Sequence, residues 1–457
     1  MNRSPHSTIY QSVDPYTQTK VHFTPTQSIK EVQLVIDQLD QEFQKWSKLS
    51  ITDRLTQLSQ VLKELSLTID TQAAIISTEM GKPITAAKGE IEKCLTLLDY
   101  YGPNSEVLLT PETYGDTERV IYQPMGVILG IQPWNYPIWQ VFRFAIPTLI
   151  AGNTVIIRHA PNVSLSAKSI QSLFDNANLP ILKCIFSDNA DTETIIQNPK
   201  IKGLAFTGST HTGSLIASLA GKHIKPCVME LGGMDPFIVL SDAKMPDTAI
   251  AAASARCTNS GQVCTNAKRF IVHESLVDTF IKEYLKATEA LIAGDPMDPK
   301  TTYGPLARKD IYDSVIKQMT TSIQMGAKAH TSPIPIPDQG LFIKPTLLTN
   351  LTPDMPVVTE EVFGPVAAVI PFKTIEEAIQ IANNIPYGLG ASIWTESKSS
   401  AEEIIPRIDA GAVFVNRAVT SLIHLPFGGT KKSGFGRELG RWGLHNFSTI
   451  KTVVTKF

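Results

Sequence analysis

The first part of the chain carries a helical pattern of apolar residues. Between Ser28 and Met80 apolar side chains recur three or four positions apart, at Val32, Val35, Leu39, Phe43, Trp46, Leu55, Leu58, Leu62 and Leu65. This spacing is typical of amphipathic helices, and we expect two of them here. A further helix is predicted from Glu90 to Tyr101, where Gly102-Pro103-Asn104 would end it.

Beyond Gly126 short apolar runs alternate with helical stretches. The first runs are Gly126 to Ile131, Thr154 to Ile157, Cys184 to Phe186 and Leu204 to Phe206. A second set comprises Pro236 to Leu240, Phe270 to Val272, Thr346 to Leu348, Val366 to Ile370, Ala391 to Trp394 and Ala412 to Val415. This rhythm predicts an α/β fold with two doubly wound domains, whose ligands lie at the carboxyl ends of parallel strands.

Two segments depart from this rhythm. Glu106 to Gln123 has polar, β-prone residues on either side of Glu112 to Asp116, which predicts a hairpin that projects from the body. The tail, Ser448 to Phe457, is expected to form a late strand. A projecting hairpin suits a contact between subunits.

Composition narrows the class of protein. The chain has 457 residues, 43% of them hydrophobic, and a net charge of −2. No run of Lys and Arg suggests nucleic acid as a partner, and no apolar run approaches the roughly 18 residues of a membrane-spanning helix. Met1 to Lys20 resembles neither a signal nor a transit peptide, so we expect a cytoplasmic protein. Five scattered cysteines indicate neither disulfides nor a zinc site, and no metal is expected.

Cys264 is the candidate nucleophile. It ends the polar loop Asn259-Ser260-Gly261-Gln262-Val263-Cys264, between a small-residue helix at Ile250 to Ala255 and a buried strand at Arg269 to His273. Backbone N–H groups at such a junction favour the thiolate, which is the reactive form. A buried, inert thiol is the alternative, and for an isolated cysteine it is the better explanation.

Three other stretches suggest partners for this cysteine. Phe206-Thr207-Gly208-Ser209, with Gly213, fits a pyrophosphate site at a helix start, although a turn glycine explains it equally well. Asn135 lies between Pro133 and Pro137 and would be a rigid oxyanion donor, unless it serves only the turn. Glu230 follows apolar residues that would raise its pKa, as a general base requires.

Six stretches occurring in order resemble motifs of the aldehyde dehydrogenase superfamily over essentially the whole chain. They are Pro133 to Pro137, Phe206 to Ser209, Glu230 to Gly233, Gly261 to Cys264, Glu361 to Pro365 and Leu425 to Gly429. Trp139 to Phe144, Arg158 to Asn162 and Ser433 to Leu439 look like the bacterial succinate-semialdehyde dehydrogenase branch. The resemblance implies dinucleotide-binding (1–105, 126–233) and catalytic (234–417) domains, oligomerisation segments (106–125, 439–457) and a return (418–438) to the cofactor domain.

The resemblance also implies a mechanism. Cys264 would attack the aldehyde, Asn135 and the Cys264 N–H would hold the oxyanion, and Glu230 would activate water against the thioester. A nicotinamide cofactor would accept hydride. Its implied binding residues are Trp134, Arg158, Ala160, Pro161, Gly208, Ser209, Gly213, Leu231, Glu361 and Phe363.

Cofactor choice depends on one departure from the family pattern. The family commonly has Lys where this chain has Arg158, and an acidic residue where it has Pro161. No carboxylate there repels a 2′-phosphate, and an Arg fork matches phosphate, so acceptance of NADP as well as NAD is predicted. In the alternative, Arg158 only replaces the general cofactor contact of the lysine.

The substrate is expected to be succinate semialdehyde. Arg143 lies where that branch has an arginine for the far carboxylate, and Trp139, Thr258 and His424 are further candidates for substrate contact. An ion pair within the protein is the alternative for Arg143. Another small aliphatic or aromatic aldehyde, or a non-catalytic protein of the same fold, remains open.

Two further expectations concern assembly and redox chemistry. In the family the hairpin and the tail join subunits, so a homodimer or homotetramer is implied. Cys257, seven positions before Cys264, would be a redox partner or, as we favour, a packed thiol.

Overall fold

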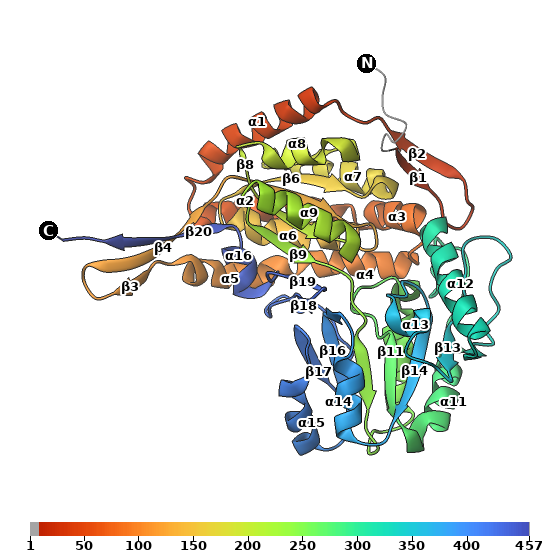
Figure 1. Cartoon of the computed structure of the whole chain (residues 1–457). Helices are drawn as coiled ribbons and strands as arrows, with labels where there is room; N and C mark the ends of the chain where they lie inside the picture. The colour runs from red at the N-terminus through yellow and green to blue at the C-terminus, as the bar shows by residue number, and fades with distance from the viewer. Residues whose placement is uncertain (1–8, 457) are drawn as a thin grey trace.

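Two β-sheets covered by helices form the body of the protein in the computed structural model, which describes residues 9–456 (Figure 1). The first sheet has the order β19-β9-β8-β5-β6-β7, and all its neighbours are parallel except β19 and β9. Its strands are β5 (Val127–Gln132), β6 (Thr154–His159), β7 (Leu182–Ile185), β8 (Ile201–Thr207), β9 (Cys227–Glu230) and β19 (Gly434–Phe435).

Helices cover both faces of this sheet because its strands are apolar on both sides. Val127, Leu129 and Ile131 pack with α1, α8 and α9, whereas Ile128 packs with α6, α7 and the helices before them. These helices are α1 (Ile29–Trp46), α2 (Ile51–Leu67), α3 (Ile69–Met80), α4 (Ile84–Leu95), α5 (Leu97–Leu109), α6 (Trp139–Ile150), α7 (Ser164–Asn176), α8 (Thr192–Gln197) and α9 (Thr210–Lys222).

The second sheet has the order β12-β13-β14-β11-β10-β16-β17, parallel except for β12. Its strands are β10 (Pro236–Val239), β11 (Arg269–His273), β12 (Lys328–Thr331), β13 (Thr346–Thr349), β14 (Val366–Phe372), β16 (Gly390–Trp394) and β17 (Ala412–Val415). Around it lie α10 (Asp247–Cys257), α11 (Val277–Thr288), α12 (Lys309–Gln324), α13 (Pro356–Thr359), α14 (Ile375–Asn383) and α15 (Lys398–Ile404). Each apolar run predicted from the sequence is a strand, which confirms the α/β class.

A three-stranded antiparallel sheet of order β20-β4-β3 extends to one side of the body (Figure 1). Its strands are β3 (Glu112–Tyr114), β4 (Glu118–Pro124) and β20 (Ser448–Val454), so the predicted hairpin and tail strand both form. Smaller elements are β1 (Tyr10–Val13), β2 (Lys20–Thr24), β15 (Tyr387–Gly388), β18 (Thr430–Lys431) and α16 (Gly440–His445). Residues 1–8 and Phe457 lie outside the described residues. Residues 1–8 belong to the segment Met1 to Lys20, which was compared above with signal and transit peptides.

The helices before the hairpin differ from the prediction. Ser28 to Met80 forms three helices rather than two, because Thr68, with φ −117° and ψ 16°, breaks the run between α2 and α3. The single helix expected from Glu90 to Tyr101 is instead the end of α4 and the start of α5, with Thr96 between them, and α5 continues through Pro103 to Leu109. Burial of Leu97, Tyr101 and Ser105 along α5 stabilises the helix against the roughly 3 kcal/mol that an interior proline costs.

The chain passes from the first sheet to the second directly after β9 and returns at β19, which pairs Gly434 with Glu230. The candidate site therefore lies between the two sheets. The boundaries of the domains stay a prediction. Across residues 9–456 no helix combines the length and apolar content that crossing a bilayer needs.

Candidate active site

The loop that carries Cys264 is held in an unusual conformation between α10 and β11. Asn259, Ser260 and Gly261 have consecutive positive φ values of 52°, 53° and 84°. Non-glycine residues rarely adopt this region, and they persist there only where surrounding structure holds them. At Gly261 even a Cβ atom would collide with the backbone of Gly364. The loop therefore packs closely against the segment that follows Glu361.

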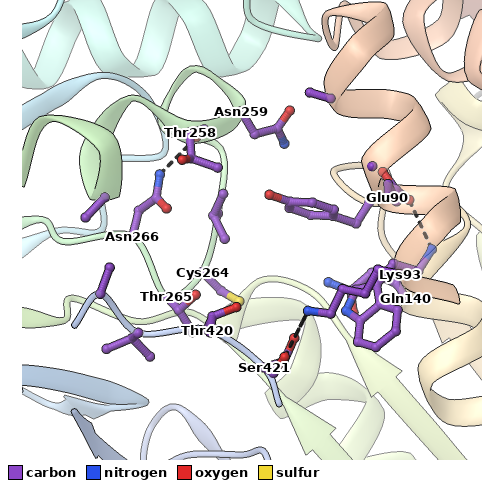
Figure 2. Close-up of a pocket in the computed structure, with 18 of the residues that line it drawn as sticks. Glu90, Lys93, Gln140, Thr258, Asn259, Cys264, Thr265, Asn266, Thr420 and Ser421 are labelled. Atoms are coloured by element: carbon purple, nitrogen blue, oxygen red, sulfur yellow. Dashed lines mark hydrogen bonds between the residues drawn. The ribbon is translucent and has the colours of Figure 1, made fainter. Parts of the chain in front are cut away.

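Two cavities meet at Cys264. One, of about 500 Å³, is lined by residues of α4, α6, α10 and the segment 417–421 (Figure 2). The other, of about 190 Å³, is lined by the ends of β8 and β9 and by Glu361 and Phe363. Cys264 and Gln140 line both cavities. A thiol in this place can meet a ligand from either side.

Asn135 is fixed beside the nucleophile loop by hydrogen bonds at both its ends. Its Nδ2 donates to the carbonyl of Gln262 at 3.0 Å, two residues before Cys264. Its own carbonyl accepts from Asn259 Nδ2 at 3.0 Å and from Lys82 Nζ at 3.1 Å. Asn135 is 5% exposed and lines the smaller cavity. The expected rigid amide is therefore present.

A buried ion pair that was not expected from the sequence supports Asn135. Lys82 Nζ contacts the carboxylate of Glu90, and both side chains are buried. Glu90 Oε1 accepts from the backbone N–H groups of Ile138 and Trp139 at 2.9 and 3.0 Å, which satisfies donors at the start of α6. The pair joins α4 to the loop that presents Asn135.

Glu230 ends β9 and lines the smaller cavity. It is 3% exposed, and neither of its carboxylate oxygens has a hydrogen-bond partner among the described residues. A Cβ on Gly428 would come within 2.6 Å of Glu230 Oε1, so this glycine makes room for the carboxyl group. Burial, followed by the charge of Glu438, raises the pKa of Glu230 well above its ordinary value. The raised pKa was expected.

The pKa of Cys264 differs from the expectation. The thiol is partly buried, and desolvation raises its pKa to about 12, although Arg143 and Lys268 lower it. Burial of the thiol therefore opposes the expected preference for the thiolate, and the positive charges of Arg143 and Lys268 favour it.

The smaller cavity gathers most of the residues expected to bind the cofactor. Trp134, Gly208, Ser209, Leu231, Glu361 and Phe363 line it. Trp134 and Phe363 stack edge to face, with ring centroids 5.7 Å apart. Gly213 lies beneath this wall, where a Cβ would collide with the side chain of Leu231.

Features of this cavity suit a dinucleotide. Ser209 caps α9, whose N-terminus opens beside the cavity and favours a negative charge. The buried hydroxyl of Thr207 in the wall has no hydrogen-bond partner among the described residues. A Cβ on Gly232 would collide with Glu361, so this glycine lets the carboxylate lie against the β9 end.

Arg158, Ala160 and Pro161 lie outside that cavity, at the carboxyl end of β6. Arg158 Nη2 donates to Asn189 Oδ1 and to the carbonyl of Ser187, the latter at 3.3 Å. Its Nε has no hydrogen-bond partner among the described residues. The carboxyl end of a neighbouring parallel strand is where the adenosine part of a dinucleotide binds in such sheets.

The larger cavity includes three of the four residues expected to contact substrate, namely Trp139, Arg143 and Thr258. His424 is exposed and does not line it. Arg143 is only 2% exposed, its Nε lies 2.5 Å from Glu438 Oε2, and its guanidinium lies 4.7 Å from the centroid of the Phe427 ring. The internal ion pair considered for Arg143 is therefore formed.

Lys93 is a cation in this cavity that sequence reasoning missed. It extends from α4 toward Ser421, whose carbonyl and hydroxyl oxygens it contacts at 2.9 and 2.7 Å (Figure 2). It also lies 4.2 Å from the centroid of the Trp139 ring. Burial, followed by Arg143, lowers the pKa of Lys93 to about 8. In the sequence it is one exposed-looking helix lysine among many.

Cys257 is packed away from the cavities. It is 5% exposed, clusters with Tyr303, Ile334 and Phe342, and its Sγ lies 3.8 Å from the hydroxyl of Tyr284. Burial raises its pKa to about 11. These surroundings favour the packed thiol over the redox partner.

Comparisons with known proteins agree with this geometry. The model of the aldehyde dehydrogenase family matches residues 2–453. The succinate-semialdehyde dehydrogenase (NADP(+)) of Deinococcus radiodurans is 38% identical over 449 residues, which cover 97% of this chain and 94% of that protein. The succinate semialdehyde dehydrogenase (NAD(P)+) Sad of Escherichia coli K12 is 37% identical, with 97% of each chain covered.

A solved structure shows the same fold. The crystal structure of succinic semialdehyde dehydrogenase from Streptococcus pyogenes, in complex with NADP+ as the cofactor, has a TM-score of 0.94 and 34% identity. The match covers 98% of this chain and 100% of that one. With its two wound sheets, its Cys264 loop between two cavities and this match along the whole chain, the protein belongs to the aldehyde dehydrogenase family.

Proposed function

We propose that the protein oxidises succinate semialdehyde to succinate with NADP or NAD, through a thioester on Cys264. The position of Cys264 at the meeting of two cavities carries this proposal, since a reacting carbon on its sulfur would be reachable from both. The names of the relatives from Deinococcus radiodurans and Escherichia coli support the substrate and both cofactors.

Cys264 and Asn135 act first in the proposed reaction. The Cys264 thiol releases its proton to solvent and adds as a thiolate to the aldehyde carbonyl, and the oxyanion of the thiohemiacetal accepts hydrogen bonds from the Asn135 amide and the Cys264 N–H. An amide nitrogen has two hydrogens, and among the described residues Asn135 Nδ2 donates to one acceptor, Gln262 O. The other hydrogen serves the oxyanion.

The bound cofactor supplies a hydride acceptor. In our proposal Trp134, Phe363 and Leu231 hold its nicotinamide end, and Glu361 holds the ribose next to the nicotinamide. Its phosphates and adenosine are held by Ser209, Gly208, Gly213, Arg158, Ala160 and Pro161. Glu230 then takes a proton from the water that hydrolyses the thioester. Its buried position and raised pKa suit a group that must accept a proton near neutral pH.

The charge of the larger cavity favours an acidic aldehyde. Its described lining includes four basic residues, Lys82, Lys93, Arg143 and Arg417, and one acidic residue, Glu90. Glu90 and Lys82 neutralise each other, and Glu438 neutralises Arg143. We propose that Lys93, with Ser421, receives the far carboxylate, while Arg143, Trp139 and Thr258 contact the carbon chain. His424 keeps a candidate role at the outer edge.

The substrate proposal is tested with Lys93→Met. Loss of a charged hydrogen bond of about 1.5–3 kcal/mol would raise the KM for succinate semialdehyde about 10- to 100-fold and leave that for butanal nearly unchanged. The matched control is Lys88→Met, which changes a partly exposed lysine on the same helix that pairs with Asp70. An unchanged KM for succinate semialdehyde in Lys93→Met would contradict the role of Lys93.

The enzyme proposal has its own test, a steady-state panel of aldehydes with NADP and NAD. A dehydrogenase for another small aliphatic or aromatic aldehyde is the alternative, and it would prefer a neutral substrate in this panel. A non-catalytic protein would produce no NAD(P)H absorbance with any aldehyde. Cys264→Ala should abolish the absorbance change, and a wild-type rate in that variant would refute the assignment of the nucleophile.

We also propose that the protein is a homodimer or homotetramer joined through the three-stranded sheet. β20 lies at an edge of that sheet, and its Ile450 and Val454 are 65% and 67% exposed. Edge strands with exposed apolar side chains tend to pair with another chain. Light scattering coupled to gel filtration distinguishes the two states, and a monomer would refute the proposal.

A further inference from the structure

A buried cluster of charges lies beneath the nucleophile loop, outside the groups assigned above to catalysis. Lys268 precedes β11 and is 2% exposed. Its Nζ donates to the carbonyl of Cys264 at 2.7 Å and to that of Val263 at 3.0 Å. A buried ammonium group needs such acceptors, because it has lost its water. Lys268 therefore fixes the backbone at Cys264, the proposed nucleophile, through these hydrogen bonds.

The same ammonium group also contacts Glu361, which lines the smaller cavity, the one proposed to bind the cofactor. Glu361 Oε1 lies 3.4 Å from Lys268 Nζ and accepts from the backbone N–H of Gly233 at 3.1 Å. Glu361 lines the smaller cavity, and its side chain is 19% exposed. Lys268 thus contacts, with one group, the residue proposed to hold the cofactor ribose and the residue proposed to attack the aldehyde.

The backbone of Asp235 also holds Lys268 in place, and its carboxyl group lies near enough to influence the lysine electrostatically. Asp235, 2% exposed, precedes β10, and its backbone carbonyl accepts from the Lys268 N–H at 3.2 Å. Burial raises the pKa of Asp235 to about 7, and Lys268 opposes this shift. The charged or titratable groups that influence Lys268 are Glu361, Asp235, Arg256 and Cys264, and Arg269 acts in turn on Asp235.

We propose that Lys268 is a positioning residue that couples occupancy of the cofactor cavity to the reactivity of Cys264. In this structure Glu361 partly neutralises the charge of Lys268. When Glu361 turns to the ribose hydroxyls of a bound cofactor, which rests on the function proposed above, the positive charge of Lys268 acts more fully on Cys264 and favours its thiolate. By linkage, ionised Cys264 binds cofactor more tightly.

The experiment measures alkylation of Cys264 by iodoacetamide, followed by mass spectrometry, against pH. The rate is determined for the full-length protein alone, with NADP, and with 2′-phospho-ADP-ribose, which has the ribose but no nicotinamide ring to cover the thiol. For wild type we expect the phospho-ADP-ribose to raise the rate at neutral pH about fivefold or more, the lower range of such couplings. No rise would overturn the proposal.

Three variants assign the coupling to Lys268. The quantity compared is the alkylation rate with 2′-phospho-ADP-ribose divided by the rate of the protein alone. In Lys268→Met this ratio should fall to about one, and in Lys268→Arg it should return part of the way to the wild-type ratio. In Glu361→Gln the ratio should also fall, while the ligand-free alkylation profile moves to lower pH, because a negative charge near the thiol is removed. An undiminished ratio in Lys268→Met refutes the proposal. Should that variant not fold, an undiminished ratio in Glu361→Gln does so.

Lys244→Met, an exposed lysine paired with Glu396, is the control and should retain the wild-type ratio. The readout needs no aldehyde, so this inference and the proposed function fail separately. A protein that oxidises aldehydes but shows no coupling refutes the inference alone. A protein that shows the coupling but oxidises no aldehyde refutes the proposed reaction alone.

Discussion

Arg143 and Glu438 form a buried ion pair, with Nε of one 2.5 Å from Oε2 of the other. Removing one partner of such a pair leaves an uncompensated charge and costs about 3–5 kcal/mol, whereas removing both often costs little. We therefore expect Arg143→Met and Glu438→Gln each to lower the melting temperature markedly, and the double variant to recover much of the loss. Thermal unfolding of the three variants checks this prediction.

The matched control for that pair is Lys222→Met, which removes an exposed ion pair with Glu193. Exposed pairs contribute about 0–1 kcal/mol, so its melting temperature should stay close to that of wild type. If the single variants at Arg143 and Glu438 melted like the control, the pair would not stabilise the fold.

Asp235 makes stability depend on pH. Its pKa is about 7 in the folded protein against an ordinary 3.8, because burial disfavours the charged form. The folded state therefore holds a proton that the unfolded state releases, and the stability from this carboxyl, full below about pH 3.8, is lost as pH rises through about 7. Asp235→Asn cannot titrate. The melting temperature of this variant minus that of wild type should therefore increase as the pH is raised from 4.5 to 8. A constant difference across this range would contradict the assignment.

Arg158 is predicted to favour NADP. Arg158→Leu should lower kcat/KM for NADP about 10- to 100-fold, the effect of losing a charged hydrogen bond, and change that for NAD less. Lys183→Met, on the neighbouring strand β7, is the control. A wild-type preference for NAD well above tenfold would instead indicate that Arg158 makes only a general cofactor contact.

Glu230→Gln should separate the two halves of the reaction. Without a base the thioester forms but hydrolyses slowly, so we expect a burst of NADPH followed by turnover lowered about 10²- to 10⁴-fold. Stopped-flow absorbance detects the burst, and intact mass spectrometry detects the acyl group on Cys264. Undiminished steady-state turnover would exclude Glu230 as the base.

The strands could be predicted from the sequence because buried parallel strands are nearly continuous apolar runs. The break at Thr68 and the passage of α5 through Pro103 could not, since tertiary burial decides both. Helix propensity and proline are local signals. The packing that overrides them involves residues distant in sequence.

Residues of the candidate site that belong to short sequence motifs could be predicted. Residues that join the site through pairs formed by the fold could not. Asn135, Glu230 and Cys264 come from three separate stretches that the fold brings to one cavity. Lys82, Lys93 and Lys268 were missed because a lysine is usually exposed. In this fold Lys82 and Lys268 are buried and Lys93 is partly buried. For the same reason the Glu438 partner of Arg143 was not foreseen.

The Lys82–Glu90 pair has a consequence for changing the specificity of the enzyme. Glu90 binds the start of α6 and Lys82 binds the carbonyl of Asn135, while Lys93 lies one turn further along the same α4 helix. The wall that we propose selects the aldehyde and the loop that presents the Asn135 amide are therefore held by the same buried ion pair. Substitutions in α4 that enlarge the substrate cavity should therefore also displace Asn135. In directed evolution, altered selectivity and slower turnover should arise together until further substitutions restore the position of Asn135.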